Sequence, residues 1–169
     1  VKEIEEGEEK RRKAEERWRE ELFKWVEEVD KYFVEILSKI GGRGYVKLEN
    51  LNNPREAGLE LYVGFRGEIE SISSRVHSGG ERTIASLAFI LALQEVTKSP
   101  FRILDEFEIH LDPENFEKAS KLLWEASRSA QYILVTPLRM RIPETADMVI
   151  FVEREGEEAR IGYKTKDNK

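Results

Sequence analysis

The sequence predicts an α/β fold, in which a mostly parallel sheet flanked by helices is preceded by an N-terminal coiled-coil helix. Three observations support this prediction. Apolar residues follow a helical spacing near the start of the chain, alternate with polar ones over residues 45–65, and then form short runs separated by helical patterns. The alternation of short apolar runs with helices is typical of parallel sheets. We therefore expect a coiled-coil arm over residues 1–40 and one lobe over residues 41–169.

The composition fits a single domain or one domain with an appendage. Of the 169 residues 40% are hydrophobic, which is enough to build a core. Charged residues make up 37%, well above the roughly 25% of ordinary domains, and many of them lie in the first 39 positions. The absence of cysteine excludes disulfides and cysteine metal ligands. A net charge of −6 argues against a generally basic nucleic-acid binder.

The arm carries one apolar seam. Its residues recur with a 4-3-4-3-4 spacing, which keeps them on one side of a helix: Trp18, Leu22, Trp25, Val29, Tyr32 and Ile36. The seam predicts a coiled coil that needs another helix, while an amphipathic helix packed on its own domain is the alternative. Gly41 and Gly42 end the helix, because glycine accepts the left-handed conformation of a C-cap.

After the arm, the pattern predicts strands first and then alternating helices and strands. Residues 45–48 and 59–65 are expected to pair as antiparallel strands around an Asn-Asn-Pro turn. A helix is expected over 79–97, and Asp112-Pro113 begins another. The apolar runs at 101–104, 132–135 and 148–152 are expected to be parallel strands, before a closing hairpin through Gly156.

A serine-glycine loop opens the long helix. Ser78 and Glu81 form an S-x-x-E capping box, and Gly79 and Gly80 let the backbone approach a phosphate closely. The unpaired N–H groups and the dipole of a helix N-terminus attract negative charge. The same loop also begins helices that bind nothing, so both interpretations stay open from these residues alone.

An acidic pair follows the strand 101–104. Asp105 is expected at the carboxyl end of that strand, where open α/β sheets place ligands, and can hold Mg²⁺ directly or through water. Glu106 can orient or deprotonate a water that attacks a γ-phosphate. A strand that ends in a solvated acidic loop has the same pattern. Arg102, inside the strand, must pair or extend its charged end to solvent.

The order of the motifs is more specific than any one of them. Ser-Gly-Gly-Glu at 78–81, a long helix, the acidic pair, His110-Leu111-Asp112, and another helix and strand follow one another. In this order the chain resembles the C-terminal lobe of an ABC-type ATPase. With the arm in front, residues 18–155 resemble the C-terminal head half of the structural maintenance of chromosomes (SMC) family. The stretches 92–106 and 131–137 are most similar to the branch that acts as a heterodimer in DNA repair.

The resemblance implies a role for each matching residue. Ser78, Gly79, Gly80 and Glu81 match the signature motif, which contacts the γ-phosphate of ATP bound to the opposite head. Asp105 matches the Walker B carboxylate associated with Mg²⁺, Glu106 the catalytic glutamate, and Asp112 the D-loop aspartate at the head–head interface.

The chain also departs from the family pattern. His77 stands before Ser-Gly-Gly, where the family usually has an apolar residue. Thr136-Pro137 occupies the switch position, where many ABC proteins have a histidine, so γ-phosphate sensing at Thr136 is weak or different. We interpret His77 and His110 as surface or interface residues, because no second metal ligand lies at a chelating spacing.

The sequence contains no phosphate loop. No G-x-x-x-x-G-K-[ST] segment occurs, and residues 41–44 have the glycines without the Lys-Ser/Thr. We therefore expect the Walker A loop on a separate N-terminal lobe, joined through a long antiparallel coiled coil. The resemblance then implies an ATPase that uses ATP and Mg²⁺ when complemented by that lobe and is inactive alone.

The implied partners are the N-terminal SMC lobe, a second head in a homo- or heterodimer, DNA reached through the complex, and a kleisin-like subunit. No apolar run approaches the roughly 18 residues of a membrane span, so we expect a cytoplasmic, nucleoid-associated protein, or a nuclear one in a eukaryote. Two alternatives stay open. One is a catalytically vestigial interaction module, favoured by Trp18 and Trp25; the other is the ATPase partner of a double-strand-break nuclease.

Overall fold

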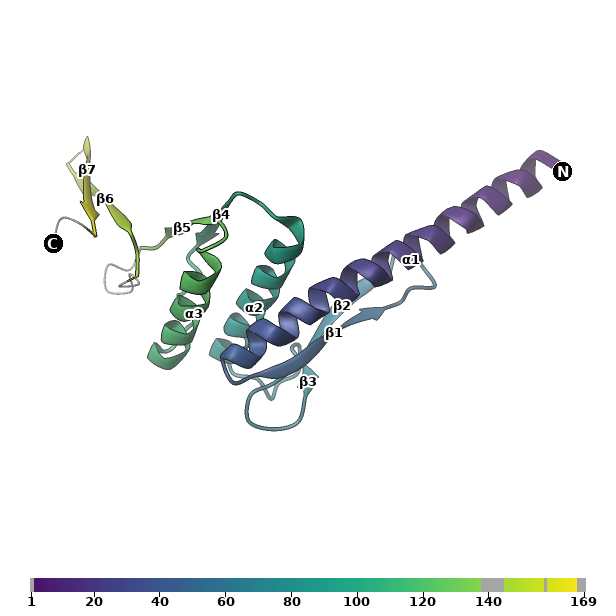
Figure 1. Cartoon of the computed structure of the whole chain (residues 1–169), viewed down its shortest axis with the longest axis horizontal. Helices are drawn as coiled ribbons and strands as arrows, with labels where there is room; N and C mark the ends of the chain where they lie inside the picture. The colour runs from purple at the N-terminus through teal and green to yellow at the C-terminus, as the bar shows by residue number, and fades with distance from the viewer. Residues whose placement is uncertain (1, 138–144, 157, 167–169) are drawn as a thin grey trace.

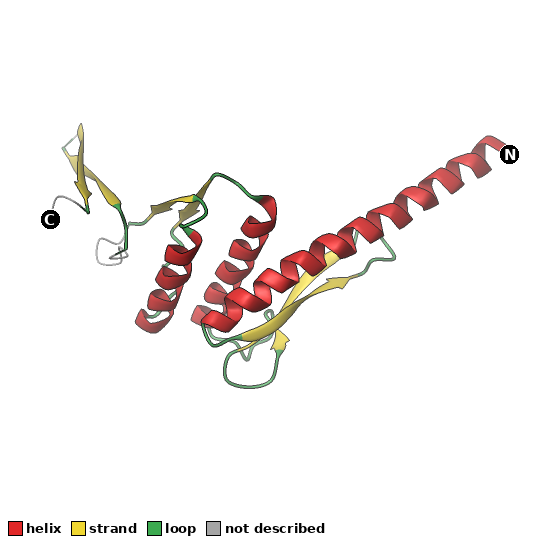
Figure 2. Ribbon diagram, in the orientation of Figure 1, coloured by secondary structure: helices red, strands yellow, loops and turns green. Residues whose placement is uncertain are grey.

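The computed structural model describes residues 2–137, 145–156 and 158–166. A long N-terminal helix leads into a small antiparallel sheet, two further helices and two more pairs of strands (Figures 1 and 2). In chain order the elements are α1 Lys2–Lys39, β1 Arg43–Glu49, β2 Gly58–Gly64, β3 Glu70–Ser71, α2 Gly79–Thr97, β4 Phe101–Asp105, α3 Pro113–Ala126, β5 Gln131–Val135, β6 Met148–Glu155 and β7 Glu158–Thr165.

Within the described residues the strands form three small sheets rather than one mostly parallel sheet. The first is antiparallel with the order β1-β2-β3, the second is the parallel pair β4-β5, and the third is the antiparallel pair β6-β7. The prediction of a parallel strand over 148–152 is therefore wrong, because Ile150 pairs antiparallel with Tyr163 of β7 and is exposed. The predicted hairpin through Gly156 is confirmed by the same register. An apolar run does not reveal which strand lies beside it, since it indicates only burial on both faces.

The first sheet agrees with the prediction. Val46 of β1 lies opposite Leu61 of β2 in an antiparallel register, and the turn between the strands includes the Asn-Asn-Pro segment. β1 also contacts α1, where the Asp30 carboxylate accepts a hydrogen bond of 2.6 Å from the backbone N–H of Val46.

Helix α1 has two different halves. Residues 3–14 are exposed on all sides, whereas the second half packs on α2 and β1 and contributes Val29, Phe33 and Leu37 to the core. The buried face is shifted from the predicted seam, since Val26 is buried and Trp25 is exposed. The shift arises because the helix is covered by a sheet and a helix together, which buries a wider stripe than a two-helix seam does. Over this half the alternative of a helix packed on its own domain describes the structure, as Figure 1 shows.

The end of α1 follows the glycine prediction. Gly41 has φ 78°, and the N–H of Gly42 donates to the carbonyl of Leu37 at 3.0 Å. This hydrogen bond caps the last turn and turns the chain into β1.

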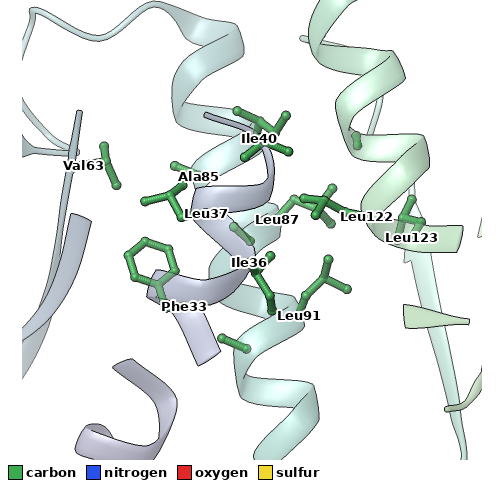
Figure 3. Close-up of a cluster of buried hydrophobic side chains, with 14 of the residues drawn as sticks. Phe33, Ile36, Leu37, Ile40, Val63, Ala85, Leu87, Leu91, Leu122 and Leu123 are labelled. Atoms are coloured by element: carbon green, nitrogen blue, oxygen red, sulfur yellow. The ribbon is translucent and has the colours of Figure 1, made fainter. Parts of the chain in front are cut away.

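The core lies where α1, α2 and α3 meet (Figure 3). Phe33 packs edge-to-face on Phe89 of α2, with ring centroids 6.0 Å apart. Helix α2 contributes Ala85 and Leu91, and α3 contributes Leu122 and Leu123. Because α2 and α3 share this core, the two helix N-termini are held in a fixed relation to each other.

Strand β4 is attached to α2 through Arg102, which is buried and paired as its position in the strand required. Its guanidinium donates to the carbonyl of Gln94 at 2.7 Å and to the hydroxyl of Tyr132 at 2.6 Å, and lies 3.6 Å from Glu95. The Tyr132 hydroxyl in turn donates to the Gln94 side chain at 2.8 Å. We call Arg102, Gln94, Glu95 and Tyr132 the arginine clamp; it ties the end of α2 to β4 and β5.

Candidate functional site

The N-terminus of α2 is an open, capped helix end. The hydroxyl oxygen of Ser78 accepts from the Glu81 N–H at 3.1 Å, and the Glu81 carboxylate accepts from the Ser78 N–H at 2.9 Å. Ser78 uses its oxygen as the acceptor in this capping box, so its hydroxyl proton is available to donate elsewhere. Ser78 and Gly79 are exposed, and a Cβ added at Gly79 would meet no atom within 4 Å. This end therefore has the donors and the open space that an anionic ligand requires.

Gly80 connects this helix end to the start of α3. It is buried, and an added Cβ would lie 2.9 Å from Nδ2 of Asn115 and 3.3 Å from Oδ2 of Asp112. Only a glycine permits so close an approach without a shift of the neighbour. The structure thus brings the predicted signature residues beside the predicted D-loop aspartate.

Asp112 is the N-cap of α3. Its carboxylate accepts from the backbone N–H of Asn115 at 2.8 Å and from the Asn115 side chain at 2.9 Å. The backbone hydrogen bond from Asn115 is the main cause that lowers the pKa of the Asp112 carboxyl, and the side-chain hydrogen bond adds to it. Asp112 is consequently a carboxylate at neutral pH, fixed at the helix end that faces Gly80.

The acidic pair lies at the carboxyl end of β4. Asp105 is the last residue of the strand, and both Asp105 and Glu106 are exposed. Glu106 has φ 50°, a left-handed conformation that is unfavourable for a residue with a Cβ. Its N–H donates to the carbonyl of Val135, at the end of β5, at 2.9 Å. Strained backbone of this kind persists where the surrounding structure fixes it, and it occurs frequently at active sites.

Sequence reasoning missed one residue in this region. Glu108, two positions after Glu106, is fully buried, and its carboxylate accepts a hydrogen bond from the hydroxyl of Thr136, the predicted switch position. A glutamate in an apolar segment before Leu111 was a weak signal, because sequence alone does not show which loop residues are buried.

The two histidines lie in different environments. His110 is exposed, as predicted, but His77 is buried, with its ring nitrogen 3.4 Å from the carbonyl of Glu70. The interpretation of His77 as a surface residue is therefore wrong, because its ring is buried and contacts the backbone of Glu70 in β3. Among the described residues no group of three or more His, Asp or Glu side chains is arranged to hold a metal ion.

The acidic pair nevertheless fits Mg²⁺ in one specific way. Magnesium in nucleotide sites is usually held by one or two carboxylates together with phosphate oxygens, rather than by a cage of protein ligands. Asp105 and Glu106 supply such carboxylates at a solvent-exposed strand end.

Comparison with known proteins places the chain in a family. Residues 26–160 match the RecF/RecN/SMC N terminal domain. The chain belongs to the RecF/RecN/SMC family. The chromosome partition protein Smc of Aquifex aeolicus is 39% identical over 117 residues, which are 69% of this chain and 10% of that protein. This member of the family therefore spans about a tenth of the length of the curated relative.

Solved SMC structures share the fold. An SMC ATPase structure, from work on ATP-driven dimerization and DNA stimulated activation, matches with a TM-score of 0.74 at 29% identity, covering 87% of this chain and 89% of that one. An Smc head bound to the C-winged helix domain of ScpA also matches with a TM-score of 0.74 at 29% identity, covering 86% of this chain and 45% of that one. The mixed α/β fold of this SMC-family chain is thus that of an SMC head.

The SMC-family chain leaves one face of its parallel strand pair open. Arg102 and Leu104 are buried on the side of the helices, whereas Ile103 of β4 is 56% exposed and Ile133 of β5 is 42% exposed on the other side. Phe101 and Val135 are exposed in the same strands. Parallel strands are normally covered on both faces, and two strands are too few for an independent sheet. We call Phe101, Ile103, Ile133 and Val135 the open face.

No helix in the part of the chain that the structure describes has both the length and the apolar character that a membrane span needs.

Proposed function

We propose that this chain is the C-terminal half of an SMC-like ATPase head, which binds and hydrolyses ATP at a head–head interface when joined to a lobe that carries Walker A. The observation that carries the proposal is the presence of two incomplete half-sites in one chain. One is the open cap of Ser78 and Gly79, packed through Gly80 on Asp112; the other is the strained acidic corner at Glu106. Neither half-site includes a phosphate loop, and the sequence contains none.

The chemistry of each residue follows from its position. Asp105 would hold Mg²⁺, which supplies charge neutralisation for the phosphates when bound. Glu106 would accept a proton from, or orient, the attacking water, because its carboxylate is exposed and its backbone is fixed. Ser78 and the helix N–H groups would contact the γ-phosphate of ATP on the opposite head, while Glu81 holds Ser78 in its capping conformation.

The open face supports the proposal that a second lobe packs on this chain. Burial of its four apolar side chains against the other lobe would stabilise both halves. In the described residues β4 pairs only with β5, so a strand of the other lobe that paired with its second edge would make β4 an interior strand. In such a position the carboxyl end of β4 faces a neighbouring strand end, where a phosphate loop would lie.

The direct test is the substitution Glu106→Gln in the head assembled from this chain and its Walker A lobe. We expect ATP turnover to fall by about 100-fold or more, because the general base is removed while the shape is kept. We also expect an ATP-bound dimer to accumulate, measured by size-exclusion chromatography with light scattering. The matched control is Glu117→Gln, an exposed glutamate on α3, which should leave both measurements unchanged. Unchanged turnover in the Glu106 variant would refute the role.

The partners and the cellular role are extensions of this proposal. The SMC ATPase structure associated with ATP-driven dimerization and DNA stimulated activation supports a second head and DNA as partners. The Smc head bound to the C-winged helix domain of ScpA supports a kleisin-like subunit. Chromosome partition, as named for the Aquifex relative, or DNA repair, as the stretches 92–106 and 131–137 suggest, would then be the role, at the nucleoid or in a nucleus.

A second candidate function is an interaction module without ATPase chemistry. The observation that favours it is the exposure of Phe23 and Trp25 on α1, since large exposed aromatic residues often anchor a partner. The same assembled head distinguishes the two functions. A wild-type head that binds its partners but shows no turnover supports the module.

A further inference from the structure

The loop after β4 is held by the end of β5 at two points. The first is the hydrogen bond from the Glu106 N–H to the carbonyl of Val135, at 2.9 Å. The second is the hydrogen bond from the Thr136 hydroxyl to the Glu108 carboxylate. The loop turns tightly around these points, because the Ile109 N–H donates to the Glu106 carbonyl at 3.4 Å and the Leu111 N–H donates to the Glu108 carbonyl at 3.0 Å. The loop is therefore held at Glu106 and at Glu108 by two consecutive residues, Val135 at the end of β5 and Thr136 directly after it.

The second point is unusual in its chemistry. Glu108 is fully buried, and a buried carboxylate is costly unless hydrogen bonds satisfy it. An apolar residue at position 108 would avoid this cost, so packing alone does not explain the glutamate. The hydrogen bond between Glu108 and Thr136 joins the loop that carries Glu106 to the predicted switch position.

Thr136 cannot serve two acceptors with one proton. A threonine hydroxyl has a single O–H donor, and in this structure that donor is directed to Glu108. A phosphate oxygen offers only lone pairs, so a productive contact with Thr136 would require that same proton. The hydroxyl is thus committed to the protein.

We propose that Thr136 is a positioning residue, which acts through Glu108 to fix the loop that carries Glu106, and is not a direct sensor of the γ-phosphate. The proposal rests on the ATPase function proposed above and deepens it. In this chain Thr136, directly after β5, fixes the position of the Glu106 carboxylate through Glu108, and the burial of Glu108 makes this part of the loop rigid.

The experiment compares Thr136→Val with Thr136→Ser in the assembled head. Valine keeps the shape but removes the hydroxyl, so we expect kcat to fall by about 100-fold, the cost of misplacing a catalytic group by a small distance. The KM for ATP should be the same in the Thr136→Val head as in the wild type. ATP-dependent dimerisation, measured in a Glu106→Gln head, should be the same with and without Thr136→Val. Serine keeps the donor and should restore kcat to within a few-fold of the wild type.

A second readout needs no turnover. Without nucleotide, hydrogen exchange at the Glu106 amide should be faster in the Thr136→Val head than in the wild type, and unchanged in the Thr136→Ser head, because the loop loses one of its two anchors. This measurement detects the loop itself, even where a variant is partly destabilised.

Three results would overturn the proposal. One is a raised KM or weaker dimerisation in the Thr136→Val head with unaltered amide exchange, which indicates direct phosphate contact. Another is a lowered melting temperature with unchanged kcat, which indicates a structural role only. The third is loss of kcat in the serine variant as well. A wild-type head without turnover refutes the ATPase function instead, and amide exchange then still decides whether Thr136 holds the loop.

Discussion

At the scale of single residues, Gly80 shows how closely the start of α2 approaches the start of α3. Its Cα faces the Asp112–Asn115 hydrogen-bonded pair at the start of α3, whereas the neighbouring Gly79 faces open space. The two adjacent glycines therefore have different reasons to be glycine. Gly80 is required by packing, and Gly79 leaves room in front of the helix end.

This difference predicts opposite effects of the same substitution. Gly80→Ala should lower the free energy of unfolding by about 1 kcal/mol, because Asn115 must move and its hydrogen bond to Asp112 is strained. Gly79→Ala is the matched control and should be neutral or slightly stabilising, since alanine favours the helix. Urea denaturation followed by circular dichroism measures both. Equal effects of the two substitutions would contradict the packing argument.

At the scale of elements, the arginine clamp determines where β4 begins relative to α2. Arg102 is almost fully buried, and three acceptors from α2 and β5 surround its guanidinium. Because α2 carries the proposed signature residues at its other end, the clamp makes this helix and strand β4 one rigid unit.

The clamp predicts a large cost for removing the guanidinium. Arg102→Met should lower the free energy of unfolding by about 2 kcal/mol, since the hydrogen bonds from the guanidinium to the Gln94 carbonyl and the Tyr132 hydroxyl are lost together with the ion pair to Glu95. Arg102→Lys should recover only part of this loss, because an ammonium group lacks the fork that reaches several acceptors. The exposed Arg75→Met is the control, and thermal unfolding is the measurement. A fully stable methionine variant would show that the clamp contributes nothing.

What the sequence could predict depends on how local each signal is. Helix α2 has the expected bounds and α3 begins as expected, because the Ser78 and Asp112 caps are decided by a few neighbouring residues. The local hairpin of β6 and β7 through Gly156 was also expected, whereas the separation of these two strands from β4 and β5, and the one-residue shift of the buried face at Val26, depend on distant partners. For the site, the motif residues were visible, while the buried Glu108 and its bond to Thr136 were not.

At the scale of the whole molecule, the chain has a packed core and one uncovered apolar sheet face. Its helical core is closed, but the β4–β5 pair is covered on one face only. Two apolar strands in this condition favour association with another sheet layer, and the proposed Walker A lobe would provide it.

The open face predicts a selective effect on assembly. Ile133→Glu should weaken binding to the Walker A lobe by about 10-fold or more, because a charge would be buried in the joint. The stability of this chain alone should hardly change, since Ile133 is already 42% exposed. Ile161→Glu, on β7 of another sheet, is the control. Isothermal titration calorimetry measures the affinity, and an equal loss in both variants would argue against this face.

The left-handed backbone at Glu106 has a consequence for how such a protein can evolve. Glycine or asparagine would relax that torsion and stabilise the fold by about 1 kcal/mol, yet either would remove the carboxylate that we propose as the general base of ATP hydrolysis. Selection for heat resistance alone would therefore favour inactive variants. Selection for ATP turnover would be needed to retain the strained Glu106.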